Sequence, residues 1–314
     1  MSMEEKQNSQ TSLDFNQNTF KPSSREEIAE IVKNCYRKNI PLEINGLKSK
    51  NKIGRNFQSE KTLDLSDYKG IIDYKPEELY IKVKAGTPLK EIIGELDKNN
   101  QQLAFEPNDF GYLFSGESNS GSIGGVVSCN FAGSRRFKVG SVRDHILGFQ
   151  GINGKGETIK SGGTVVKNVT GYDLSKLIAG SFGTLVALTE ITLKVLPKKD
   201  SSKTVIIYPN NFEQIYDLFN KLSSSSSEIS GAVFIPEQSN DKEFSAKRNN
   251  VFKFNDLKSK VSFVAFRVEG DKISIEEKIN NLKKELELNN SDISILDVHQ
   301  SEPFWEKINN LEVF

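Results

Sequence analysis

The chain has 314 residues, and its 42 Lys and Arg balance 42 Asp and Glu, so the formal net charge is zero. This length predicts roughly two domains with a sizeable core. A neutral chain has no long-range field that would attract nucleic acid or an anionic membrane. With 2 Cys and 2 His, a cysteine-rich zinc site or an unaided iron–sulfur cluster is excluded.

The ends and cysteines of the chain indicate where the protein works. Residues 1–19 are polar, lack the basic and apolar regions of a secretory signal, and are expected to form a disordered tail. Cys35 and Cys129 are far apart, which favours a reducing cytoplasm over a disulfide framework. No stretch approaches the ~20 apolar residues that span a bilayer. A role at a membrane would therefore depend on a partner.

The first part of the chain predicts an α+β arrangement. Ser24 and Glu27 have capping-box spacing, which predicts a helix from about Ser24 to Asn39, with Cys35 on its apolar face. A strand is expected at Pro41–Ile44 and another at Leu79–Lys84, where apolar and polar residues alternate. Thr87-Pro88 then starts a helix whose expected apolar face consists of Leu89, Ile92, Ile93 and Leu96.

Composition changes near residue 200, where we place a domain boundary between 20–199 and 200–314. The second domain alternates strands and helices in a βαβ–βαβ pattern, typical of a ferredoxin-like α+β sandwich. The expected strands are 204–208, 231–235, 261–268 and 293–298, and the expected helices are 212–222 and 274–288.

Glycine is concentrated in the first domain, where 15 of the 23 glycines fall between Gly116 and Gly183. Glycine allows close backbone approach, so this crowding indicates a ligand or another strand packed on the chain. Asn45–Lys50 follows a strand and could turn backbone N–H groups towards a phosphate, or could simply be a turn. Ser120–Gly133 has few bulky side chains and suits either an extended dinucleotide or a tightly packed loop.

Further blocks occur in order along this region. They are Ile123-Gly124-Gly125, Gly140-Ser141-Val142-Arg143-Asp144, Gly162-Gly163, Lys167-Asn168-Val169-Thr170-Gly171-Tyr172-Asp173-Leu174 and Gly180-Ser181-Phe182-Gly183-Thr184-Leu185. Together they resemble the FAD-binding domain of the vanillyl-alcohol oxidase (PCMH-type) flavoproteins, and among these the smaller FAD-binding (E) subunits of glycolate oxidase. The resemblance covers about residues 12–200 and continues more weakly to the end.

This resemblance implies a PCMH-type domain of two α+β subdomains with FAD between them. Asn45–Lys50 would hold the pyrophosphate, Ile123–Gly133 would run beside the adenosine diphosphate and ribityl chain, and Gly183–Val186 would lie near the pyrimidine edge of the flavin. The implied FAD-binding residues are Asn45, Gly46, Leu47, Lys48, Ser49, Lys50, Pro107, Gly121, Ser122, Ile123, Gly124, Gly125, Ser128, Asn130, Gly133, Gly183, Thr184, Leu185 and Val186.

The chain departs from the family pattern in three places. Leu47 and Lys48 stand where the pyrophosphate loop of the family is often glycine-rich. The loop has no histidine to attach flavin covalently, so FAD is expected to bind non-covalently. Relatives continue beyond the region that matches Glu302–Trp305, so the second, cap-like domain is expected to be truncated.

The resemblance further implies oxidation of a 2-hydroxy acid, glycolate to glyoxylate, by hydride transfer to flavin N5. The side chains considered for substrate binding or proton transfer are Arg135, Arg136, Arg143, His145, Lys167 and His299. Each also fits a structural role, as an ion pair, a buried imidazole or a solvated lysine, and no catalytic residue is assigned.

Two functions therefore remain open. In one, the chain oxidises glycolate or a related acid at its own flavin; in the other, it is a non-catalytic FAD carrier that relays electrons or braces a catalytic sister subunit. A sugar or alditol dehydrogenase is less favoured, and a Rossmann NAD enzyme is disfavoured because no GxGxxG follows an early strand. The implied partners are a second FAD-binding subunit and an iron–sulfur subunit, which could bring this chain to the inner face of a membrane.

Overall fold

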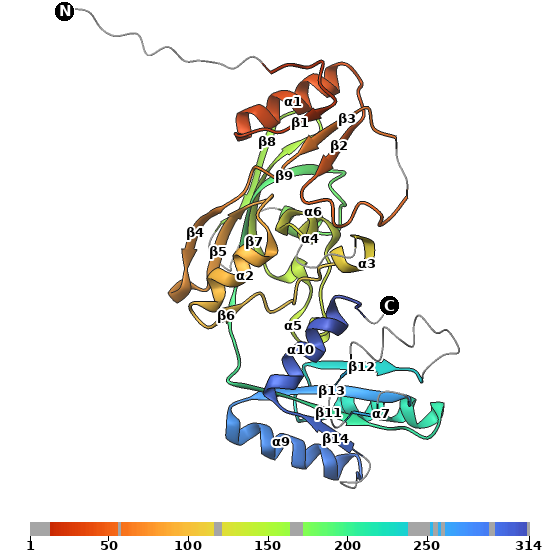
Figure 1. Ribbon diagram of the computed structural model, residues 1–314. Coiled ribbons are helices and arrows are strands. Elements are labelled where there is room, and N and C mark those ends of the chain that lie inside the picture. Colours follow the sequence, from red (N-terminus) through yellow and green to blue (C-terminus); the bar gives the residue numbers. More distant parts are fainter. Residues whose placement is uncertain are drawn as a thin grey trace, which may run out of the picture.

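A computed structural model describes residues 13–55, 58–115, 121–163, 172–237, 252–253, 257–258, 261–288 and 293–312 (Figure 1). In this part of the chain, no helix is both long enough and apolar enough to cross a membrane. The chain forms an N-terminal subdomain, a second subdomain and a C-terminal domain, in this order. The fold class predicted from the sequence, mixed α+β, is confirmed.

The N-terminal subdomain packs one helix on a small parallel sheet of order β1-β3-β2. Its elements are β1 (Thr19–Phe20), α1 (Arg25–Arg37), β2 (Leu42–Asn45) and β3 (Lys61–Asp64). Ser24 caps α1 as predicted, because its hydroxyl accepts the N–H of Glu27 at 3.2 Å. The Glu27 carboxylate, however, accepts the N–H of Ser23 at 2.7 Å and not that of Ser24.

A five-stranded antiparallel sheet of order β4-β5-β9-β7-β8 forms the second subdomain. Its strands are β4 (Ile71–Lys75), β5 (Tyr80–Lys84), β7 (Ile146–Asn153), β8 (Thr158–Gly162) and β9 (Val186–Lys194). The main helices that pack with it are α2 (Leu89–Asp97), α4 (Ile123–Cys129) and α6 (Leu174–Ile178). Shorter elements are η1 (Pro76–Glu78), β6 (Gln101–Gln102), α3 (Gly111–Ser115), α5 (Arg136–Val139), η2 (Val142–Asp144) and β10 (Leu196–Pro197).

The start of α2 differs from the prediction. Pro88 occupies the N-cap position, and Thr87 instead donates its hydroxyl to the carbonyl of Lys84 at 2.6 Å and accepts the N–H of Gly70 at 2.9 Å. Thr87 thus closes the turn between β5 and α2. Ile93 was expected on the apolar face but is 40% exposed.

The C-terminal part is an antiparallel sheet of order β12-β13-β11-β14, which is the strand order of a ferredoxin-like fold. Its elements are β11 (Ser201–Ile207), α7 (Phe212–Ser224), β12 (Gly231–Ile235), β13 (Phe263–Gly270), α9 (Lys272–Glu285), β14 (Ile293–Leu296) and α10 (Val298–Asn309). The predicted βαβ–βαβ order is therefore confirmed. Helix α10 was not expected: β14 ends at Leu296, because Asp297 caps a new helix and forms a capping box with Gln300.

Helix α10 covers the face of this sheet opposite to α7 and α9 and runs back towards the first domain (Figure 1). Phe304 and Trp305 are 0% and 1% exposed, so burial of these two rings stabilises a helix that contains Pro303.

Candidate flavin site

Two predicted segments meet beside the sheet: the loop after β2, residues 45–50, and the start of α4. A Cβ atom on Gly46 would lie 2.3 Å from Oγ of Ser122, so only glycine allows the loop to pass this close. A Cβ atom on Gly121 would lie 3.2 Å from Nζ of Lys50. The two segments were predicted separately, and the structure brings them together.

The loop exposes a row of hydrogen-bond donors. Lys48 adopts φ 59°, a left-handed conformation that costs a side-chain-bearing residue about 1–2 kcal/mol. Within the described part of the chain, no acceptor contacts the backbone N–H groups of residues 47–50. Successive free N–H groups around a left-handed residue form an anion-binding concavity. The donor set therefore suits a diphosphate, even though Leu47 and Lys48 replace glycines.

Lys50 adds a positive charge to this loop. Its ammonium donates to Oγ of Ser49 at 3.1 Å and forms no ion pair with a carboxylate among the described residues. Burial lowers the pKa of Lys50, whereas the nearby Cys129 and Asp109 favour its protonated form. A half-buried ammonium without a counter-ion is costly, and a bound anion would offset that cost.

The first turn of α4 mainly packs against, and hydrogen-bonds to, the segment between β5 and α2. The N–H groups of Ile123 and Gly124 donate to the carbonyls of Thr87 at 3.0 Å and Ala85 at 2.8 Å, and Ile123 is fully buried. A Cβ atom on Gly124 would lie 2.7 Å from the Ala85 oxygen. These two backbone N–H groups are therefore already bonded within the protein and not available to a ligand. The N–H of Gly125 makes a contact of only 3.5 Å with Ser122.

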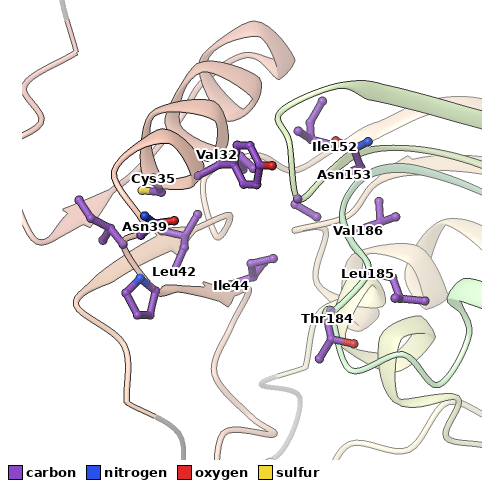
Figure 2. A pocket seen from close by; sticks show the side chains of 16 residues that line it. Val32, Cys35, Asn39, Leu42, Ile44, Ile152, Asn153, Thr184, Leu185 and Val186 are labelled. Atoms are coloured by element: carbon purple, nitrogen blue, oxygen red, sulfur yellow. The ribbon is translucent and has the colours of Figure 1, made fainter.

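A cavity of about 460 Å³ opens between α1, β2 and the start of β9 (Figure 2). The predicted residues Gly183, Thr184, Leu185 and Val186 line one wall. The opposite wall comes from α1 and the chain after it, and was missed from the sequence: Val32, Cys35, Tyr36, Asn39, Ile40, Pro41, Leu42 and Ile44. Cys35 is 3% exposed, as its place on the apolar face of α1 predicted. Nothing in that spacing distinguishes a helix face that packs from one that also lines a cavity.

Of the remaining predicted residues, Ser128 and Asn130 contact other segments of the first domain, and Gly133 lies at the C-terminal domain. Asn130 has φ 55°, and its side-chain oxygen accepts the N–H of Arg143 at 3.0 Å. The carbonyl of Ser128 accepts the N–H of Phe182 at 2.8 Å. A Cβ atom on Gly133 would lie 2.8 Å from Cγ of Asn309, a residue of α10. The predicted site residues thus extend from the cavity to the contact between the two domains.

The polar side chains considered for chemistry are mostly occupied or exposed. Arg135 is ion-paired with Glu106 at 3.1 Å and with Glu269 at 2.5 Å. Burial lowers the pKa of His145, whose Nε2 lies 3.0 Å from the carbonyl of Val139. Arg136, Arg143 and His299 are exposed, and Lys167–Gly171 lie outside the described residues. Among the residues described, no group of three or more His, Cys, Asp and Glu side chains could hold a metal ion.

Comparison with known proteins identifies the class of this domain. Residues 17–162, a little under half of the chain, match the model of the FAD binding domain family, and this match supports FAD as the cofactor of this part of the chain. The loop donors, the adjacent lysine and the cavity fit such a dinucleotide.

Among curated proteins, the chain is similar to glycolate oxidase subunit GlcE of Escherichia coli, with 42% identity over 56% of this chain and 48% of the relative. It is also similar to a D-lactate dehydrogenase of Anaerostipes hadrus, with 33% identity over 61% of this chain and 38% of the relative. The chain therefore spans about half or less of the length of these relatives. Among solved structures, an alkyldihydroxyacetonephosphate synthase shares the fold with a TM-score of 0.70 and 18% identity, over 94% of this chain and 54% of that one.

Proposed function

We propose that this chain is an FAD-dependent oxidoreductase of the 2-hydroxy-acid class, and that it oxidises glycolate to glyoxylate as the FAD-binding subunit of a glycolate-oxidase-like complex. This proposal is supported mainly by the free N–H row of residues 47–50 with Lys50 beside it, and by a cavity whose lining includes Ile44, the residue before the loop 45–50. The sequence similarity to a glycolate oxidase subunit supports glycolate as the proposed substrate.

The cofactor is proposed to run from the cavity to the domain contact. Residues lining the cavity would hold the adenine, residues 45–50 would hold the diphosphate, and Pro107 and Gly133 would border the flavin. A flavin must face the space where substrate binds, and Gly133 borders the second domain through Asn309. This orientation moves Gly183–Val186 from the pyrimidine edge of the flavin, where the sequence suggested them, to the adenine. Binding is non-covalent, because residues 45–50 include no histidine.

Bound FAD supplies the acceptor, at N5, for the hydride that leaves the substrate carbon. The residues of this chain would orient the cofactor: the N–H row would donate hydrogen bonds to the diphosphate, Lys50 would offset part of its charge, and the mainly apolar side chains of the cavity would pack on the adenine. Loss of the hydroxyl proton requires a base, and Arg135 and His145 are both held in other contacts.

That last observation favours a second candidate function, a non-catalytic FAD carrier that relays electrons or braces a catalytic sister subunit. In either case the proposed partners are a second FAD-binding subunit and an iron–sulfur subunit. Glycolate oxidase subunits of two kinds, GlcE and GlcD, are among the similar proteins, which supports a complex of more than one flavin chain. We place the complex in the cytoplasm, with contact to the inner membrane face only through partners.

The first experiment is a visible spectrum of the purified chain, followed by acid precipitation. Flavin bands whose colour moves to the supernatant support non-covalent FAD, and colour that stays with the pellet contradicts it. The second experiment is turnover of glycolate with an artificial electron acceptor. Turnover by the isolated chain refutes the carrier function, whereas turnover only after a sister flavin subunit is added supports it.

A further inference from the structure

The segment between β6 and α3 is buried although it forms no helix or strand. Phe105 is 0% exposed, and the polar residues Asn108 and Asp109 are each 6% exposed. Between them Glu106 adopts φ 51°, a left-handed conformation that is unfavourable for a residue with a side chain. A segment in this state must be held by contacts from outside it.

Glu106 provides the main contact. Its carboxylate accepts the backbone N–H of Arg135 at 2.7 Å and also pairs with the Arg135 guanidinium at 3.1 Å. From the C-terminal domain, the guanidinium of Arg267 donates two bonds to the same carboxylate, at 2.6 and 3.1 Å. Bidentate pairs of this kind fix geometry as well as adding energy. One carboxylate thus joins the two domains.

Arg267 is itself held rigidly on β13. Its side chain is 3% exposed, and it donates to Oγ and to the carbonyl of Ser230 at 3.1 and 3.0 Å. Its guanidinium lies 4.8 Å above the ring of Trp305. Glu269, paired with Arg135, completes a cluster of two positive and two negative charges. Because the cluster is neutral, removing one member leaves a buried charge unpaired.

Residues 105–109 are also hydrogen-bonded to the C-terminal end of α10. The side-chain amide of Asn108 donates to the carbonyl of Asn309 at 2.5 Å, and the N–H of Asp109 donates to the side chain of Asn310 at 3.1 Å. Pro107, near which the flavin is proposed to lie, is thus flanked on both sides by residues bonded to the C-terminal domain. The second domain therefore sets the shape of this segment.

We propose that Glu106 and Arg267 are positioning residues for the flavin: through them the C-terminal domain holds residues 105–109 against the cofactor, so that domain docking and FAD binding are coupled. This inference rests on the proposed function, because it requires the flavin to pass Pro107. Coupling of this kind is reciprocal, so that bound FAD also stabilises the docked domains.

The test compares E106Q, R267Q and the double variant by titrating the apoprotein with FAD and recording the visible spectrum of the bound flavin. Each single change is expected to weaken FAD binding about tenfold or more, within the range of linked sites, and to change the flavin spectrum. The double variant is expected to resemble the single ones, since partners in one network are not additive. The matched control is K138A, which removes the exposed contact of Lys138 with the Glu228 carbonyl between the same domains, 3.1 Å long. It should change affinity by about threefold or less.

Far-ultraviolet circular dichroism and thermal unfolding report whether each variant is folded. The fluorescence of Trp305, the single tryptophan, is not suited to this control because Arg267 lies on its ring. R267K, which keeps the charge, replaces R267Q if the latter does not fold. The proposal is overturned if folded variants bind FAD with unchanged affinity and spectrum, or if the two single effects simply add. A wild-type chain that binds no FAD overturns both this inference and the proposed function. FAD binding without glycolate turnover counts against the activity alone.

Discussion

Replacing Lys50 with methionine tests the anion site in two opposite directions. In the apoprotein the ammonium is half-buried and lacks a carboxylate partner among the described residues, and burial lowers its pKa. A lysine whose pKa is lower in the folded than in the unfolded protein destabilises the fold at every pH below its folded pKa. This cost falls as the pH rises from the folded pKa towards the unfolded one. K50M should therefore raise the melting temperature of the apoprotein at neutral pH, by about 2–4 °C for each 1 kcal/mol of relief.

The same change should weaken FAD binding. A hydrogen bond to a charged group contributes about 1.5–3 kcal/mol, which corresponds to a loss of about 10- to 150-fold in FAD affinity. Lys48 provides the matched control, because it lies in the same loop but is exposed; K48M should change either quantity by about 0.5 kcal/mol or less. The measurements are thermal unfolding of the apoprotein and fluorescence titration with FAD. A K50M apoprotein that melts lower and binds FAD normally would show that Lys50 is a structural residue and not part of an anion site.

Three further changes test other parts of the site. G46A should weaken FAD binding and cost about 1–3 kcal/mol of stability, measured by urea unfolding, because its Cβ would lie 2.3 Å from Oγ of Ser122. Adding S122G to the same chain should restore part of both the affinity and the stability. No restoration would contradict this steric cause. L185W should fill the cavity and lower FAD affinity about tenfold or more with little change in melting temperature. The control L177W, on an exposed part of α6, should bind FAD normally. If L185W and L177W bind FAD with equal affinity, the adenine does not bind in this cavity. Burial alone would raise the pKa of Glu269, but the hydrogen bond and charge of Arg135 and the charge of Arg267 lower it from 4.5 to about 2. By linkage, ionised Glu269 contributes about 3 kcal/mol to the free energy of unfolding. This contribution is present above pH 4.5 and is lost as the pH falls towards 2. The stability of E269Q, measured by acid unfolding, should therefore fall less over this pH range than that of the unchanged protein.

Local patterns made parts of the fold predictable, whereas the site residues came from the family resemblance and stay a prediction. Gly46 and Gly121, named through that resemblance, do lie where a Cβ atom would approach a neighbouring side chain closely. The capping of α1 was predicted because Ser24 acts within its own first turn. The ferredoxin-like strand order followed from the alternation of elements after residue 200. Each of these features depends on residues close in sequence or on a repeated pattern.

Contacts between distant segments were not predictable. The wall of the cavity from α1 reads in sequence as an ordinary apolar helix face, and its role depends on where β9 packs. Helix α10 was not predicted. It contains Pro303, which is unfavourable inside a helix, and burial of Phe304 and Trp305 against a distant sheet stabilises it. The ion pair of Glu106 with Arg267 joins residues 161 positions apart, and no spacing rule relates them.

The buried ionisable groups of this chain differ in how their charge is accommodated, and that difference separates the site from its support. Arg267 and Glu269 are paired in a neutral cluster, so their burial needs no ligand. His145 avoids the problem because burial lowers its pKa and favours the neutral ring. Burial lowers the pKa of Lys50 as well, but Cys129 and Asp109 favour its protonated form, and its ammonium lies beside free backbone donors without an ion pair to a carboxylate among the described residues. An arrangement that is costly in the free protein is explained if its partner is an anion that binds from outside. This is why we propose Lys50, and not the larger ionic cluster, as the marker of the cofactor site.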